Sequence, residues 1–145
     1  MLLNLRHAGI VVQDLERMLR FWRDVMGLQV VIDFREEGRF IDTVQGLSGV
    51  RLRMIKLRAP DGSMIELLHD EAHPTPPPEH NDLCDRGIRH LAFTVADVEA
   101  VWEMLRREGC TTLSEPVLAP DGKARLFFAR DPEGNLMELV QVIQT

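Results

Sequence analysis

The chain carries one sequence pattern twice, which limits it to folds built from two similar units. Residues 88–100, IRHLAFTVADVEA, match residues 5–17, LRHAGIVVQDLER, at an offset of 83 positions. The match aligns His90 with His7, in each case among apolar residues. Self-similarity at a fixed offset indicates repeated supersecondary units.

A second match marks the end of each copy. Residues 132–139, PEGNLMEL, match residues 60–67, PDGSMIEL, at an offset of 72. Proline fixes φ and glycine accepts a positive φ, so each stretch predicts a turn followed by a strand. Glu66 and Glu138 stand at equivalent places in the two strands. Each copy therefore begins with a histidine strand and ends with a glutamate strand.

A helix is predicted between these strands in each copy. Apolar residues recur at helical spacing after Asp14 and again after Asp97. An aspartate at the N-cap accepts hydrogen bonds from the first turn, and Gly27 and Gly109 are suitable C-terminal stops. Short β-rich segments follow each helix. The pattern predicts strand–helix–strand–strand–strand in each copy.

The two copies define a domain organisation. Module one spans residues 3–70 and module two spans residues 88–142, within one domain of 145 residues. Residues 71–87 contain four prolines at 74–78, which favours an extended linker. A lid over a site is the alternative role for this segment.

Composition excludes several classes of function. The net charge of −6 argues against a nucleic-acid surface, because phosphate binding needs clustered Lys and Arg. No apolar run approaches the roughly 18 residues of a membrane span. Cys84 and Cys110 have no motif spacing and are interpreted as reduced thiols, so we expect a cytoplasmic protein.

The repeated histidines and glutamates are the candidate functional residues. Side chains alternate across a strand, so each histidine or glutamate lies opposite the apolar residues that flank it. The apolar face can pack on the helix of its own copy, which leaves the ionisable face to line a concave surface. An unpaired carboxylate in such a place is costly. Two imidazoles and two carboxylates suit Zn, Ni, Co, Mn or Fe. We therefore predict one divalent metal ion bound by four residues: His7, Glu66, His90 and Glu138.

The chain resembles the vicinal oxygen chelate superfamily over residues 5–142. The resemblance lies in the openings RHAGIVVQDLERMLRFWRDVMGL and RHLAFTVADVEAVWEML, in DPEGNLMELVQ, and in the spacing of the four candidate ligands. That superfamily includes glyoxalase I, methylmalonyl-CoA epimerase, extradiol dioxygenases and the fosfomycin and bleomycin resistance proteins. The resemblance implies an α+β fold in which two tandem βαβββ modules form an open, curled mixed sheet around the metal. It also implies a homodimer that acts on a small molecule.

The ligand set is most similar to that of glyoxalase I. By this resemblance the metal stabilises an enediolate while Glu138 moves a proton between adjacent carbons, with Glu66 as the second candidate for proton transfer. The reaction would be that of a lyase or isomerase of the lactoylglutathione lyase type, on a small carbonyl compound or thiol conjugate. Two positions depart from the glutathione-binding pattern: Val11 stands in place of an arginine and Asp70 in place of an asparagine.

Three alternative functions stay open. Methylmalonyl-CoA epimerase has similar openings and a long linker, but carries glutamine where this chain has Glu66. Extradiol dioxygenases need only two His and one Glu for Fe(II), and a fourth ligand would crowd that site. A bleomycin-resistance type of binding protein usually lacks the metal set, so the four residues argue against a non-enzyme.

Other conspicuous residues are interpreted as structural. Arg51 and Arg53 share one face of a strand, and a solvated face is expected because arginine is mostly exposed. Contact with an anionic substrate is the alternative. Trp22 and Trp102 lie on the apolar stripes of the helices. The remaining histidines, His69, His73 and His80, lie at a strand end or in the linker and are expected to be exposed.

Overall fold

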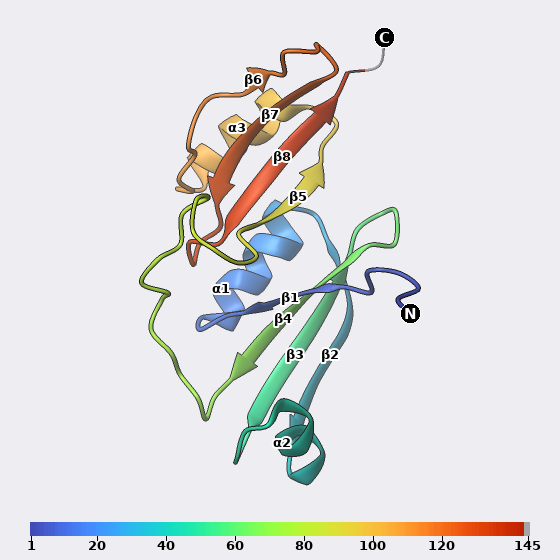
Figure 1. Ribbon diagram of the computed structural model, residues 1–145, viewed down its shortest axis with the longest axis vertical. Coiled ribbons are helices and arrows are strands. Elements are labelled where there is room, and N and C mark those ends of the chain that lie inside the picture. The colour runs from blue at the N-terminus through green and yellow to red at the C-terminus, as the bar shows by residue number, and fades with distance from the viewer. Residues whose placement is uncertain (144–145) are drawn as a thin grey trace. The chain divides into compact units, whose positions relative to one another are not determined.

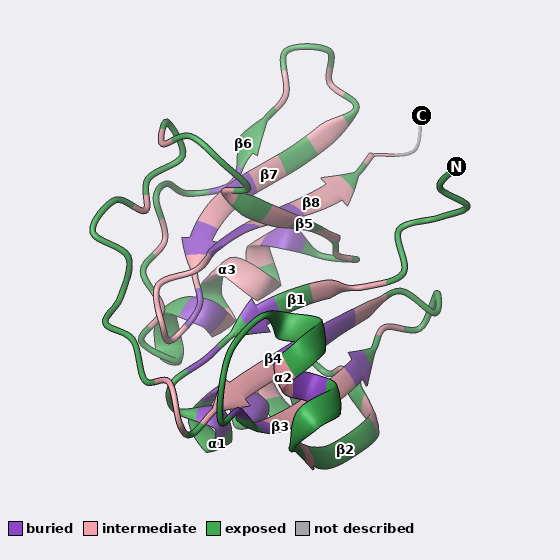
Figure 2. Cartoon of the chain, turned by 60° about the horizontal axis from the view of Figure 1, so that its bottom comes forward, coloured by how far each residue is buried: buried purple, intermediate pink, exposed green. Residues whose placement is uncertain are grey.

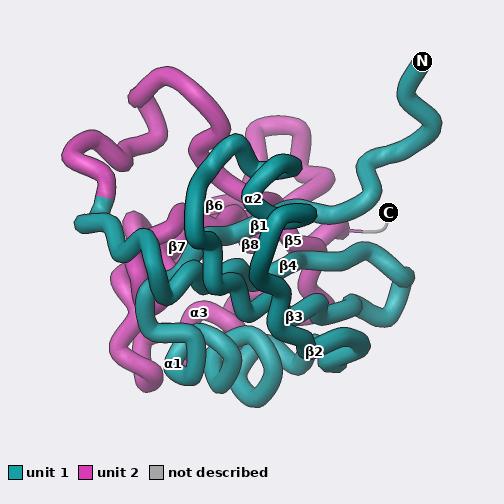
Figure 3. Tube along the Cα trace, turned by 90° about the horizontal axis from the view of Figure 1, so that it is seen from below, with its two compact units in different colours: residues 1–77 teal, residues 78–145 magenta. Residues whose placement is uncertain are grey.

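The computed structural model describes residues 1–143. It divides the chain into two compact units, Met1–Pro77 and Pro78–Thr145, which are coloured separately in Figure 3. Residues 71–87, the Pro-rich segment, form turns and irregular backbone without a helix or strand. The module boundaries expected from the sequence stay a prediction.

The first unit is a four-stranded mixed sheet with three helical segments (Figure 1). Its elements are β1 (Ala8–Val11), α1 (Leu15–Arg20), the π-helical turn η1 (Phe21–Val25), β2 (Gln29–Glu37), α2 (Arg39–Gln45), β3 (Arg51–Arg58) and β4 (Met64–Asp70). The strand order is β1-β4-β3-β2. β1 runs parallel to β4, and the other two pairs are antiparallel.

The second unit repeats this topology. Its elements are β5 (His90–Thr94), α3 (Val98–Arg107), β6 (Val117–Leu118), β7 (Ala124–Arg130) and β8 (Leu136–Val142). The order β5-β8-β7-β6, with β5 parallel to β8, is that of the first unit. The α+β class and the two tandem modules with unclosed mixed sheets are thus confirmed.

Both predicted helix starts are confirmed. The Asp14 carboxylate accepts a hydrogen bond from the backbone N–H of Arg17 at 3.0 Å. The Asp97 carboxylate accepts one from Ala100 at the same distance, 3.0 Å. Each aspartate satisfies an N–H group that has no partner inside its helix.

The two helices end differently. Gly27 and Gly109 both have a φ of 78°, so each supplies the left-handed residue expected after its helix. The first helix widens before it ends, because the N–H of Met26 bonds to the carbonyl of Phe21, five residues back. The widened turn makes η1 a continuation of α1, which the apolar spacing alone did not predict.

Helices α1 and α3 each bury apolar side chains, and Figure 2 colours the buried residues purple. Helix α1 lies against β4, and α3 lies against β7 and β8. The alternation predicted for the strands is present: Ile10 and Val12 are buried while Val11 between them is exposed. The buried side chains of the first helical segment and of α3 are Leu15, Met18, Leu19, Phe21, Trp22, Val98 and Leu105.

Helix α2 was not predicted. It is seven residues long, follows Gly38, and ends at Gly46, which has a φ of 67°. Only Ile41 is buried within it, against Val50 and Leu52. One buried position gives no periodicity, so sequence pattern could not distinguish this helix from a loop.

Within residues 1–143, no helix is long and apolar enough to cross a membrane.

Candidate functional site

Two equivalent turns bring the glutamates into their strands. In the first unit the N–H of Ala59 bonds to the carbonyl of Ser63 at 2.8 Å. In the second, the N–H of Asp131 bonds to the carbonyl of Asn135 at 2.9 Å. The glycines of the two turns, Gly62 and Gly134, have φ values of 91° and 90°. Turn geometry fixes strand register, so each glutamate follows its turn at the same distance.

The first unit brings His7 and Glu66 together. The Nε2 atom of His7 lies 3.1 Å from Oε2 of Glu66. Glu66 is buried, and its side chain is only 10% exposed. The other ring nitrogen of His7 is buried and has no hydrogen-bond partner among the described residues. The contact with Glu66 therefore sets the orientation of the imidazole.

The second unit brings His90 and Glu138 together in the same way. The Nε2 atom of His90 lies 3.3 Å from Oε2 of Glu138. This pair is more exposed than the first, with 38% of the histidine side chain and 21% of the glutamate side chain accessible. The ring of Phe128 meets the imidazole edge-on, with centroids 5.2 Å apart.

The structure thus pairs each predicted histidine with the glutamate of its own unit. Within residues 1–143 it forms no group of three or more His, Cys, Asp or Glu side chains placed to hold a metal ion. Each unit taken by itself supplies two potential metal ligands, one histidine and one glutamate. The assignment of all four residues to one metal ion stays a prediction.

The spacing inside each pair fits two ligands of one metal ion. Metal–nitrogen and metal–oxygen bonds are about 2.1 Å long, so ligand atoms at a right angle lie about 3.0 Å apart and those at a tetrahedral angle about 3.4 Å apart. The observed separations of 3.1 and 3.3 Å fall within this interval. The His7–Glu66 separation of 3.1 Å also lies within the range of a hydrogen bond, whereas the His90–Glu138 separation of 3.3 Å is slightly longer than that range.

Sequence reasoning missed Lys56 as a member of the site. Its Nζ atom lies 3.4 Å from Oε1 of Glu66, the carboxylate oxygen that His7 does not contact. Lys56 pairs with Glu66 in the register of β3 and β4, so both point to one face of the sheet. The sequence contained a sign of this role. At the 72-residue offset Lys56 aligns with Phe128, so the charge at this position is not part of the repeated pattern.

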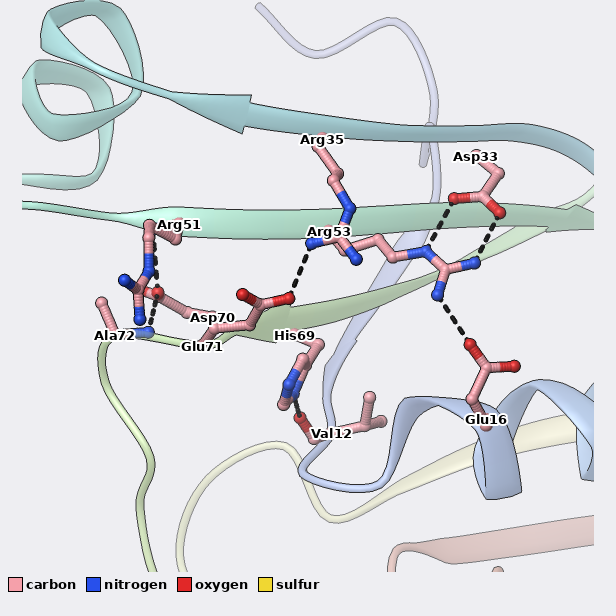
Figure 4. Close-up of polar contacts among 10 residues, drawn as sticks. All are labelled: Val12, Glu16, Asp33, Arg35, Arg51, Arg53, His69, Asp70, Glu71 and Ala72. Carbon is pink, nitrogen blue, oxygen red and sulfur yellow. Dashed lines mark hydrogen bonds and ion pairs between the residues drawn. The ribbon is translucent and has the colours of Figure 1, made fainter.

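Asp70 has a structural role (Figure 4). Its carboxylate accepts hydrogen bonds from the backbone N–H groups of Arg51 and Ala72. It also contacts Nδ1 of His73 at 2.6 Å. Burial by itself would raise the pKa of Asp70, but these hydrogen bonds outweigh it and the pKa is lowered. The carboxylate therefore satisfies backbone N–H groups at the end of β4.

Two histidines expected to be exposed are partly buried instead. His69 contacts the carbonyl of Val12 through Nδ1 at 2.9 Å, and His73 contacts Asp70. His80 is exposed, as expected. Their positions at a strand end and in a proline-rich segment led us to expect all three in solvent. The Val12 carbonyl gives His69 a polar partner, and Asp70 gives one to His73.

Arg53 joins three elements of the first unit (Figure 4). Its guanidinium donates two hydrogen bonds to Asp33 on β2, and its Nη1 lies 2.6 Å from Glu16 on α1. The side chain is only 22% exposed, so the expectation of a solvated face was wrong for this residue. Hydrogen bonds to Arg53 lower the pKa of Asp33 despite partial burial.

Substitution of Asp70 by asparagine should reduce the dependence of stability on pH. A carboxyl group with a lowered folded-state pKa contributes stability above its unfolded pKa of about 3.9, and this contribution is lost as the pH falls through the folded value. We expect Asp70→Asn to lower the free energy of unfolding at pH 7 by about 1–3 kcal/mol, with the difference vanishing in acid. Urea unfolding at several pH values measures this. An equal effect of Glu79→Gln, at an exposed position in the linker, would contradict it.

Comparison with known protein sequences identifies related enzymes. The Glyoxalase/Bleomycin resistance protein/Dioxygenase superfamily matches residues 4–139. An ethylmalonyl-CoA/methylmalonyl-CoA epimerase from Cereibacter sphaeroides is 31% identical over 96% of this chain and 98% of its own length. A probable lactoylglutathione lyase from Synechocystis is 27% identical over 94% of both chains.

Solved structures show the same fold. The crystal structure of a glyoxalase family protein from Bacillus cereus has a TM-score of 0.90 and 27% identity, covering 99% of this chain and 97% of that one. The fosfomycin resistance protein FosX from Listeria monocytogenes, in complex with Mn(II), shares the fold with a TM-score of 0.64 and 16% identity, covering 99% of this chain and 95% of that one. Sequence match and topology together show that the chain belongs to the glyoxalase/bleomycin resistance protein/dioxygenase superfamily.

Proposed function

We propose that this protein is a metal-dependent lyase or isomerase of the glyoxalase I type. One observation carries the proposal: each unit places a histidine Nε2 about one ligand–ligand distance from a glutamate Oε2, at equivalent positions of the repeat. The proposed ligands of one divalent ion are His7, Glu66, His90 and Glu138. Their nitrogen and oxygen donors suit Ni, Zn, Co, Mn or Fe. Membership in a superfamily that includes FosX, with its Mn(II), supports a metal.

The two glutamates have different surroundings, which supports different roles. Glu66 contacts both His7 and Lys56 through separate oxygens and is buried. Glu138 contacts His90 through one oxygen, and its side chain is about twice as exposed as that of Glu66. A carboxylate that moves a proton must reach the substrate. We therefore assign proton transfer to Glu138 and a fixed ligand role to Glu66.

The proposed reaction needs three contributions from the chain. The histidines hold their imidazole nitrogens toward the carboxylates, and Glu66 is held between His7 and Lys56. Glu138 takes a proton from the carbon next to a carbonyl group and returns it to the adjacent carbon. A bound divalent ion would supply Lewis-acid polarisation of the carbonyl oxygen.

An epimerase is the second candidate function. The curated relative with 31% identity is an ethylmalonyl-CoA/methylmalonyl-CoA epimerase. Its chemistry also begins with removal of a proton next to a carbonyl, but the proton returns to the same carbon. The departure at Val11 from the glutathione-binding pattern favours this candidate over a glutathione conjugate. The small-molecule substrate, the homodimer and the cytoplasmic location stay predictions.

Elemental analysis of untagged protein, purified without chelators and under low oxygen, tests the proposal. We expect about one Ni, Co, Zn or Mn for each set of four ligands, and a proton-transfer assay on hemithioacetals, 2-oxo compounds and acyl-CoA thioesters would follow. Stoichiometric Fe with activity on catechols would favour a dioxygenase. Absence of bound metal, with no thermal stabilisation by added ions, would contradict the proposal and favour a ligand-binding protein.

A further inference from the structure

Lys56 is a partly buried cation whose hydrogen-bonding capacity is mostly unused. Its side chain is 14% exposed and points to the sheet face of Glu66. An ammonium group carries three N–H donors. Among the described residues the structure gives it one charged partner, Glu66, at the long distance of 3.4 Å. Donors beside the His7–Glu66 pair are therefore available to another acceptor.

The second unit shows that the fold does not require this charge. Phe128 pairs with Glu138 in the register of β7 and β8, as Lys56 pairs with Glu66. The two units share strand order and equivalent turns, yet one has a cation at this position and the other an aromatic ring. The second unit keeps the same topology without a charge at this position. The charge of Lys56 is therefore not needed for the fold, which indicates that it has a function.

The choice of lysine over arginine is also informative. Lys56 and Lys123 are the only lysines among the 17 basic residues of the chain. An arginine facing Glu66 would bind both carboxylate oxygens with its planar guanidinium group. Neither oxygen would then be available to a metal ion. A lysine contacts one oxygen and leaves the other to its neighbour, as observed for Oε1 and Oε2 of Glu66.

We propose that Lys56 binds an anionic oxygen of the substrate beside the His7–Glu66 pair. The substrate class is then a carbonyl compound with a carboxylate or comparable anionic oxygen next to the reacting carbons, of which a 2-oxo acid is the simplest. This inference rests on the proposed function for the location of the reaction. Asp70, which could have repelled such an anion, is bonded to backbone N–H groups instead.

Selective isotope labelling tests the proposal directly, because the chain has two lysines. Protein grown with ¹³C-lysine gives two ε-CH₂ NMR signals, which Lys56→Met assigns. Zinc-loaded protein is titrated with pyruvate and, separately, with pyruvamide, its uncharged analogue. We expect the Lys56 signal to shift saturably with pyruvate only, while Lys123, an exposed residue, stays unchanged. Lys56→Met should weaken pyruvate binding about tenfold or more, whereas Lys123→Met should not.

Two results would overturn the assignment. One is a Lys56 signal that pyruvate does not move; the other is equal binding of pyruvate by wild type and Lys56→Met. Failure of the proposed function gives a separate result, since the wild type would then retain no zinc. The same titration on metal-free protein would in that case decide whether Lys56 binds the anion. Circular dichroism of Lys56→Met shows whether the variant keeps its fold.

Discussion

Removal of the His7 imidazole is expected to abolish metal binding. Imidazole nitrogen is one of two ligand types that the first unit offers, and Glu66 without it keeps only the ion pair with Lys56. Loss of an outer partner of a metal ligand already costs about 10–100-fold in affinity. Loss of a ligand itself should therefore cost more than about 100-fold, and His90→Ala should have the same effect. Metal content after gel filtration, by mass spectrometry, measures both.

His80→Ala is the matched control for these two variants. His80 is exposed in the linker and outside the proposed ligand set, so its removal should leave metal content unchanged. The ion pair of Lys56 and Glu66 does not involve His7, so the first unit should still fold in His7→Ala. Full metal occupancy in either His7→Ala or His90→Ala would remove that histidine from the ligand set.

Glu138→Gln is expected to abolish turnover while weakening metal binding only modestly. The amide keeps a carbonyl oxygen that can bind a cation, but it cannot take up a proton. Loss of a positioned acid–base group typically costs about 10²–10⁴-fold in rate. Solvent deuterium incorporation into product, together with metal content, separates the loss of proton transfer from the loss of metal.

Glu66→Gln provides the comparison inside the same site. Glu66 is held by two partners and is assigned a fixed ligand role, so its substitution should reduce metal affinity more than Glu138→Gln does. A larger rate loss in Glu66→Gln than in Glu138→Gln, both at saturating metal, would reverse the two roles. Unchanged activity of Glu138→Gln on the true substrate would exclude Glu138 from the reaction.

The sequence predicted those parts of the fold that have a local chemical signature. Asp14 and Asp97 cap the helices as expected, because capping depends on one side chain and a few backbone groups. Proline and glycine predicted the turns before Glu66 and Glu138. The presence of one histidine strand and one glutamate strand in each unit followed from the repeat, whereas the contact inside each pair is a finding of the structure. The metal itself stays a prediction.

The parts that escaped prediction depend on contacts between distant residues. Helix α2 buries one side chain, Ile41, and β6 has only two residues, so neither has a measurable period. Arg53 was expected in solvent because nothing in its neighbourhood shows that Asp33 and Glu16 lie beside it. Lys56 was overlooked because its partner Glu66 comes from the next strand, although the repeat aligns Lys56 with Phe128.

The difference between Lys56 and Phe128 has a stereochemical consequence. Two identical His–Glu pairs would give a planar enediolate or enolate the same environment from either pair. A cation beside one pair and an aromatic edge beside the other remove that equivalence. If Lys56 holds the anionic end of a substrate, as proposed, that end would lie beside Glu66 and not beside Glu138. The planar carbon would then present one fixed face to Glu138, and the proton would return to that face. One unmatched pair of residues thereby makes the two copies of the duplicated module chemically distinct.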